Sequence, residues 1–140
     1  MNDDQMLKDI LLSTKTIASV GLSSNPGKES YWIVRYLQEH GYRVIPVNPT
    51  TAEILGEKAY PDLESVPEKI DVVQVFRRSE DVPPVVDSAI RAGAKVVWMQ
   101  EGIVNQEAAQ KARAAGLQVV MDACMRATHR RLLGDNLLRL

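Results

Sequence analysis

The chain has little of several things that define common protein classes. It holds one cysteine, Cys124, which excludes an intrachain disulfide and a metal cluster built from cysteines. Its 17 Lys and Arg residues balance 18 Asp and Glu residues, and a general nucleic-acid binder usually carries a basic excess. No apolar run approaches the ~20 residues that span a bilayer. The N-terminus, Met1-Asn-Asp-Asp-Gln5, has a net negative charge in its side chains and lacks the charged-then-apolar pattern of a signal peptide. We therefore expect a cytoplasmic protein with neither membrane nor nucleic acid as its partner.

The chain does contain an alternation of apolar runs and amphipathic segments over 140 residues, the length of one ordinary domain. Apolar runs predict buried strands at 16–22, 42–47, 71–76, 95–99 and 117–121. Helical spacing predicts helices at 4–13, 31–40, 83–92 and 107–115. We expect a single domain over residues 1–140 with an α/β fold, in which a doubly wound, mostly parallel five-stranded Rossmann-like sheet carries helices on both faces. Right-handed crossovers favour the strand order 3-2-1-4-5.

In such a sheet, ligands bind beyond the carboxyl ends of the strands, at the switch point of the strand order. In the predicted order, the loops after the first and fourth strands flank that point. The loop 21–29 leads from an apolar run into a helix that starts near Ser30, and a helix N-terminus attracts anions. Lys28 lies in this loop, and Arg77 and Arg78 follow the third strand. The sequence therefore predicts an anionic, phosphorylated ligand.

The fingerprint of dinucleotide-binding proteins is absent from this loop. It requires three spaced glycines and an acidic residue after the second strand. The chain has Gly21, Ser23 and Pro26 at the glycine positions, and its second strand ends in Val47-Asn48-Pro49. The loop also lacks the Gly-Lys-Ser/Thr of a Walker motif. An NAD-type nucleotide-binding regulatory module is therefore kept only as an alternative.

Seven short segments between residues 16 and 133 follow one another in a fixed order and spacing. They are Val20-Gly-x-Ser23, Pro26-x-Lys28-x-Ser-Tyr31, Tyr36-Leu-x-x-x-Gly-Tyr42, Val44-Ile-Pro-Val-Asn-Pro49, Asp71-Val-Val-x-Val-Phe-Arg77, Trp98-x-Gln-x-Gly-Ile103 and Gly116-x-x-Val-Val-Met-Asp122-x-Cys124. Together they resemble the single-domain CoA-binding protein family, which is related to the CoA-binding domain of the succinyl-CoA synthetase α subunit. Each segment alone is weak, and the specificity lies in their order.

The resemblance implies a Rossmann-like fold that binds coenzyme A, or a short acyl-CoA, at the C-terminal rim of the sheet. A ligase would also need a second domain and a phosphorylatable histidine, so we expect a binding protein rather than an enzyme. The synthetase has a lysine after its second strand where this chain has Thr50 or Thr51, so Lys28 or Arg77 would replace its phosphate contact. The implied ligand-binding residues are Gly21, Ser23, Ser24, Asn25, Pro26, Lys28, Asn48, Pro49, Phe76, Arg77, Arg78, Met99, Gln100, Glu101 and Gly102. No catalytic residue and no metal ligand is assigned.

Three further features leave alternatives open. Cys124 follows the last strand at the rim. It is either a small buried hydrophobic residue or the reactive thiol of a redox activity on CoA disulfides. Gln74 is a polar residue in a strand that should be buried on both faces, and the sequence does not explain it. The C-terminal leucines are Leu132, Leu133, Leu137, Leu138 and Leu140. They suggest a tail that packs on its own domain or on a second subunit, as in a homodimer.

Overall fold

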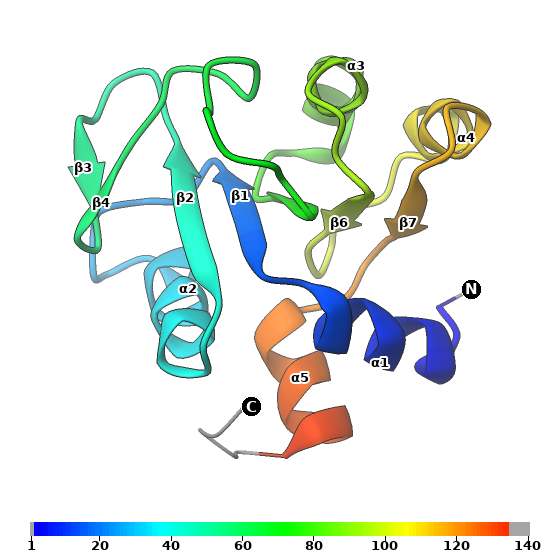
Figure 1. The fold of residues 1–140 in the computed structure, drawn as a ribbon, viewed down its shortest axis with the longest axis horizontal. Helices are drawn as coiled ribbons and strands as arrows, with labels where there is room; N and C mark the ends of the chain where they lie inside the picture. The colour runs from blue at the N-terminus through cyan, green and yellow to red at the C-terminus, as the bar shows by residue number, and fades with distance from the viewer. Residues whose placement is uncertain (1, 135–140) are drawn as a thin grey trace.

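The computed structural model describes residues 2–134 and contains each of the predicted strands and helices (Figure 1). Along the chain the elements are α1 (Asp4–Ser13), β1 (Thr16–Val20), α2 (Glu29–Glu39), β2 (Arg43–Val47), β3 (Glu53–Ile54), β4 (Glu57–Lys58), β5 (Val72–Val75), a 3-10 turn η1 (Ser79–Asp81), α3 (Val82–Arg91), β6 (Val96–Met99), α4 (Gln106–Ala114), β7 (Gln118–Val120) and α5 (Met125–Leu133). Within residues 2–134, none of the helices combines the length and the apolar character needed to span a membrane.

The main sheet is parallel and has the order β2-β1-β5-β6-β7. The predicted order 3-2-1-4-5 is therefore wrong: β5, the third predicted strand, lies beside β1 and not outside β2. The outer edge of β2 is already occupied, because Tyr60 donates its N–H to Pro46 O at 3.0 Å and accepts from Asn48 N at 2.8 Å. The chain then crosses over to the far side of β1. The switch point therefore lies between β1 and β5, so the loops after these two strands are neighbours.

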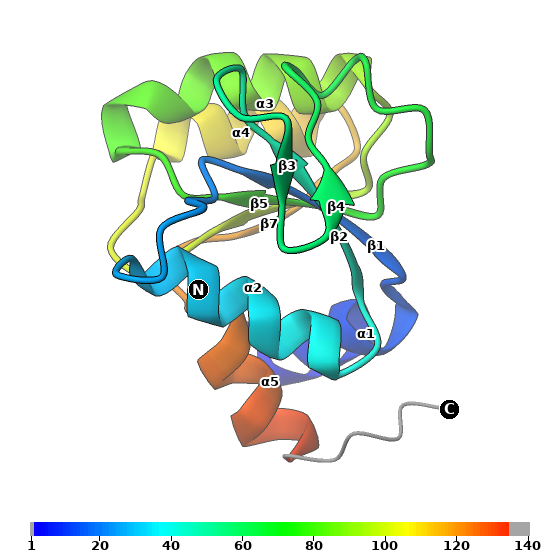
Figure 2. The ribbon, with the colours of Figure 1, turned by 90° about the vertical axis from the view of Figure 1, so that its left-hand side faces the viewer.

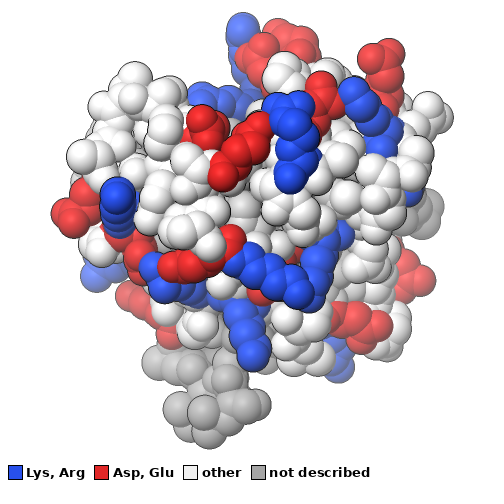
Figure 3. Space-filling model, turned by 45° about the horizontal axis from the view of Figure 1, so that its top comes forward, with Lys and Arg blue, Asp and Glu red and all other residues white. Residues whose placement is uncertain are grey.

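Helices cover both faces of the sheet (Figure 1 and Figure 2). Alternate strand residues point to opposite faces. Ala18 and Val73 join the apolar core under α3 and α4, whereas Ile17 and Val72 join the core under α1, α2 and α5. On the face over α3 and α4, acidic and basic side chains are interspersed, with no wide area of one sign (Figure 3). The fold class predicted from the sequence is confirmed.

The C-terminal segment forms α5, which packs against α1 and α2. Leu132 and Leu133 are partly buried against the core on this side of the sheet. The other leucines of the expected tail, Leu137, Leu138 and Leu140, lie outside the described residues. A homodimer stays a prediction.

Asp71 joins the starts of β1 and β5 at the edge of the sheet opposite to the rim. Its Oδ2 accepts hydrogen bonds from the backbone N–H groups of Lys15 and Thr16, both at 3.0 Å. Its Oδ1 lies 3.6 Å from Lys95 Nζ. Burial acts to raise the pKa of Asp71, but these hydrogen bonds and the ammonium group outweigh it. The pKa of Asp71 is therefore held below its ordinary value of 3.8.

Candidate functional site

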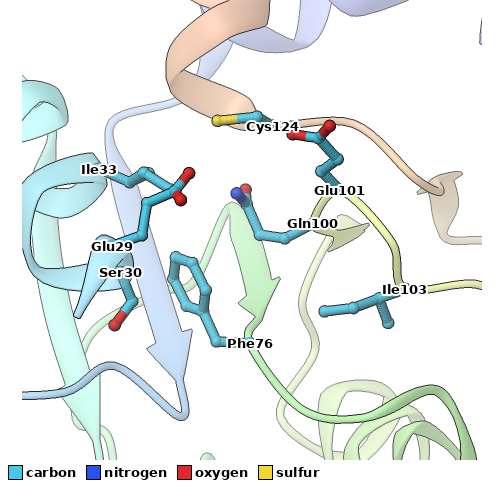
Figure 4. Close-up of a pocket in the computed structure, with 8 residues that line it drawn as sticks. All are labelled: Glu29, Ser30, Ile33, Phe76, Gln100, Glu101, Ile103 and Cys124. Atoms are coloured by element: carbon cyan, nitrogen blue, oxygen red, sulfur yellow. The ribbon is translucent and has the colours of Figure 1, made fainter.

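A hollow of about 470 Å³ lies at the C-terminal rim of the sheet (Figure 4). Four parts of the chain line it: the first turns of α2, the residue after β5, the loop after β6 and the residue before α5. The lining residues are Glu29, Ser30, Ile33, Phe76, Gln100, Glu101, Ile103 and Cys124. This is the position where the topology of a doubly wound sheet places a ligand.

Gly21 allows the loops after β1 and β5 to approach each other beside the hollow. Its φ is +89°, in the left-handed region. A Cβ at this position would lie 2.8 Å from the carbonyl oxygen of Phe76. Because Phe76 lines the hollow, this close approach shapes one wall of the site.

A chain of buried hydrogen bonds runs beneath the hollow and ends at its floor. Ser19 Oγ donates to Gln74 Oε1 at 2.9 Å, and Gln74 Nε2 donates to Gln100 Oε1 at 3.3 Å. The backbone N–H of Met125, at the start of α5, donates to the same Gln100 oxygen at 3.1 Å. Gln74 is therefore polar because it connects β1 to the loop after β6. These hydrogen bonds connect β1, β5 and the N-terminus of α5 to one amide in the loop after β6.

The two helices whose N-termini border the hollow have no cap from the side chain that precedes them, although the Met125 N–H of α5 already donates to Gln100 Oε1. Lys28 precedes α2 and Cys124 precedes α5, and neither side chain accepts a hydrogen bond from the first turn. By contrast, Asp3 caps α1 and Asn105 caps α4. Uncapped N–H groups and the helix dipole together favour an anion near such N-termini.

The loop 21–28 uses several of its own N–H groups internally. Asn25 N donates to Ser23 Oγ at 3.0 Å, Gly27 N donates to Asn25 Oδ1 at 2.8 Å, and Lys28 N donates to Asn25 O at 2.9 Å. Ser23 N donates to Ser30 Oγ at 3.1 Å. The loop is therefore held in shape by its own polar groups.

Charged groups of both signs surround the hollow. The Glu29 and Glu101 carboxylates lie on its lining. Arg126 of α5 places its Nη2 4.0 Å from Glu29 Oε1, which connects the two helices that border the hollow. Lys28 is exposed beside the start of α2.

The structure brings together part of the predicted ligand-binding set. Phe76, Gln100 and Glu101 line the hollow. The residues Ser24, Asn25, Pro26 and Lys28 are exposed in the loop that leads into α2, and Gly21 and Ser23 of the same loop are partly buried. Gly102 lies in the loop after β6, where its N–H donates to Asp122 Oδ1 at 2.7 Å.

The remaining predicted residues lie elsewhere. Met99 is fully buried in the core under α3 and α4. Asn48 holds its own turn, accepting from Thr50 N at 2.8 Å. Pro49 and Arg77 line a second hollow of about 230 Å³ beside α3. Arg78 pairs with Glu80 and Asp81 of η1, at 3.7 Å and 3.2 Å.

Several lining residues were absent from the predicted set, and Cys124 was named only for the redox alternative. Glu29 and Ser30 lie where the sequence predicts the rim loop and the helix start, but the resemblance assigned no ligand contact to them. Ile33 lies inside the predicted helix and gave no chemical signal. Residues 29 and 33 are one turn apart and share a helix face, which brings Ile33 to the rim beside Glu29. Ile103 was missed because an apolar residue in a loop gives no chemical signal.

Both histidines lie away from the hollow, in the core between α2 and α5. His40 is 2% exposed and His129 is fully buried. The Tyr36 hydroxyl lies 2.8 Å from His129 Nδ1, and the Tyr36 and His40 rings stack at a centroid distance of 3.9 Å. These contacts make both imidazoles part of the packing.

Comparison with known proteins gives a consistent set of relatives. The sequence model of a family described as "CoA binding domain" matches residues 15–130. Uncharacterized protein YneT of Bacillus subtilis (strain 168) is 44% identical over 123 residues, which cover 88% of this chain and 91% of that protein. A hypothetical protein from Pyrococcus horikoshii OT3 has a solved structure with a TM-score of 0.92 and 44% identity, covering 95% of this chain and 94% of its own.

A more distant relative is a subunit of a larger enzyme. The α subunit of the ADP-forming acetate–CoA ligase I of Pyrococcus furiosus is 29% identical over 131 residues. The match covers 82% of this chain but 28% of that subunit. The chain therefore corresponds to about a quarter of the ligase subunit.

Proposed function

We propose, since this chain belongs to the CoA-binding domain family, that it binds coenzyme A or a short acyl-CoA at the C-terminal rim of its sheet. One observation carries the proposal: the hollow at this rim is bordered by two helix N-termini that have no cap from the preceding side chain. Coenzyme A combines an anionic nucleotide with a long, neutral arm that ends in a thiol. A site with anion-attracting helix ends at its border and apolar walls inside matches both parts of that molecule.

The phosphates would lie over the exposed loop Ser24–Lys28 and the first turn of α2, with Lys28 as their cation. The neutral arm would enter the hollow between Phe76 and Ile103, toward Gln100. Arg77, in the second hollow beside Pro49, is the second candidate for a phosphate contact. A phosphate bound by a charged hydrogen bond contributes about 1.5–3 kcal/mol to affinity.

The proposal is for binding, without the complete chemistry of a ligase. The ligase relative is a much longer protein, and the chain spans 28% of it. His40 and His129 are buried in the core rather than placed on the hollow, so neither offers an accessible imidazole there.

Calorimetric titration of the full chain with CoA, acetyl-CoA, NAD and ATP tests this function. We expect saturable binding of CoA and acetyl-CoA at micromolar concentrations, with NAD and ATP giving no saturable heat at the same concentrations. NAD differs from CoA in lacking both the 3′-phosphate and the pantetheine arm. Saturable binding of NAD together with no heat from CoA at high micromolar concentration would contradict the proposal.

A second candidate function is thiol–disulfide exchange through Cys124, favoured by the position of this cysteine on the hollow. In this step the Cys124 thiolate attacks one sulfur of a CoA disulfide and forms a mixed disulfide with one CoA. The electron pair of the broken S–S bond leaves with the other CoA as its thiolate. Cys124→Ser removes the attacking sulfur. If the variant exchanges CoA disulfides as fast as the wild type, this function is ruled out.

A further inference from the structure

The amide of Gln100 has a fixed orientation in the floor of the hollow. Gln100 is 4% exposed, and its Oε1 accepts hydrogen bonds from Met125 N and Gln74 Nε2. A backbone N–H can only donate, so the amide atom that faces Met125 N must be the oxygen. The amide NH2 is therefore directed away from both donors. Figure 4 shows this amide in the middle of the ring formed by the other labelled side chains.

Among residues 2–134, no protein acceptor faces the NH2 group of Gln100, and this group opens onto the hollow, although the residue as a whole is only 4% exposed. A polar group at such a position bonds either to water or to a bound ligand. The hollow therefore presents an NH2 donor in a fixed position. A ligand that places an acceptor at this point gains a hydrogen bond.

The surroundings of the donor select the kind of acceptor. Ile33, Phe76 and Ile103 supply apolar surface around it. The carboxylates of Glu29 and Glu101 lie on the same lining, and like charges repel an occupant that is itself anionic. The fitting acceptor is therefore a neutral carbonyl oxygen that carries a small apolar group.

We propose that the Gln100 amide donates a hydrogen bond to the thioester carbonyl of a short, uncharged acyl group on CoA, so that the hollow selects acyl-CoA over free CoA. The inference rests on the proposed function, because it takes CoA as the occupant of the hollow. Free CoA ends in a thiol, which is a weak acceptor and leaves the donor poorly satisfied. Ser19 and Gln74 are positioning residues, because they act on the ligand through the Gln100 amide.

The direct test compares acetyl-CoA with S-ethyl-CoA by calorimetry. S-ethyl-CoA keeps the sulfur and both carbons of the acyl group but has CH2 in place of the carbonyl. We expect the wild type to bind acetyl-CoA about tenfold more tightly, which is the effect of one well-formed hydrogen bond from a buried donor. Succinyl-CoA, which adds a carboxylate, should bind more weakly than acetyl-CoA.

Gln100→Glu is the matched variant. It keeps an oxygen for Met125 N–H and for Gln74, and replaces the donor NH2 by an acceptor oxygen. The preference for acetyl-CoA over S-ethyl-CoA should fall to about one. Gln110→Glu, on the exposed surface of α4, adds the same charge remote from the hollow and should leave the preference unchanged.

Equal affinity of the wild type for acetyl-CoA and S-ethyl-CoA would overturn the inference and leave CoA binding intact. An undiminished preference in a folded Gln100→Glu variant would also overturn it, because the carbonyl would then be recognised by another group. Absence of binding by CoA and all its esters would instead overturn the proposed function. The wild-type comparison decides the inference even if the variant does not fold.

Discussion

Replacing Gly21 by alanine should destabilise the protein more than the same change at Gly93. Gly21 has a φ of +89°, and a Cβ there would lie 2.8 Å from the Phe76 carbonyl oxygen and 3.2 Å from its carbonyl carbon. Gly93 has a φ of +74°, and a Cβ there would meet nothing within 4 Å. The two positions therefore share the backbone strain of a positive φ, while the steric overlap occurs at Gly21.

The expected magnitudes follow from these two terms. A non-glycine residue in the left-handed region costs about 1–2 kcal/mol, which applies to both variants. The overlap at Gly21 is with backbone, and relieving it requires the end of β5 to shift, which adds about 1–3 kcal/mol. Gly21→Ala should therefore lose about 2–5 kcal/mol and Gly93→Ala about 1–2 kcal/mol. For a protein of this length, 1 kcal/mol corresponds to about 3 °C in Tm.

Thermal unfolding followed by circular dichroism, with urea unfolding as a second measure, compares the two variants with the wild type. The Tm of Gly21→Ala should fall by about 6–15 °C and that of Gly93→Ala by about 3–6 °C. Equal losses at the two positions would refute the reasoning, because the close approach of the loops after β1 and β5 would then contribute nothing.

Three further changes test other parts of the structure. Gln74→Leu should lower the free energy of unfolding in urea by about 1–3 kcal/mol, because it leaves the buried Ser19 hydroxyl without its partner. Adding Ser19→Ala should restore part of that loss. Additive losses in the double variant would argue against the chain of buried hydrogen bonds. Because the pKa of Asp71 is lowered in the folded state, its stabilisation is present above about pH 5 and is lost as the pH falls below about 4. The stability difference between wild type and Asp71→Asn should therefore shrink over that range, and a difference independent of pH would contradict this. Lys28→Ala should weaken CoA binding about tenfold in calorimetry, whereas the control Lys8→Ala, at an exposed position of α1, should not. If the two variants bind CoA with equal affinity, a cation other than Lys28 contacts the phosphate.

The five strands of the main sheet and helices α1 to α4 could be predicted from the sequence because they depend on local periodicity, whereas β3, β4 and α5 were not predicted. The strand order could not, because each strand reads the same whichever neighbour it pairs with. Both the predicted and the observed orders satisfy right-handed crossovers. In the observed order the outer edge of β2 is occupied by Tyr60, through a non-local contact that local periodicity does not reveal.

The sequence places the candidate site at the C-terminal edge of the sheet, where the structure has a hollow, but the lining of this hollow could be predicted only in part. Phe76, Gln100 and Glu101 came from the resemblance and lie on the hollow. Gln74 could not be explained from the sequence because its partners are Ser19, 55 residues away, and Gln100, 26 residues away. A polar residue in a buried strand indicates that such a partner exists without identifying it.

The central claim, that CoA binds in the hollow at the C-terminal rim, is tested most directly by a titration of the isotope-labelled protein with CoA followed by amide NMR shifts. Binding at the rim should give the largest shifts at residues 23–33, 76, 100–103 and 124–126. A contradictory result would be saturable shifts confined to the opposite edge of the sheet, around Lys15, Lys69 and Lys95, with the rim unchanged.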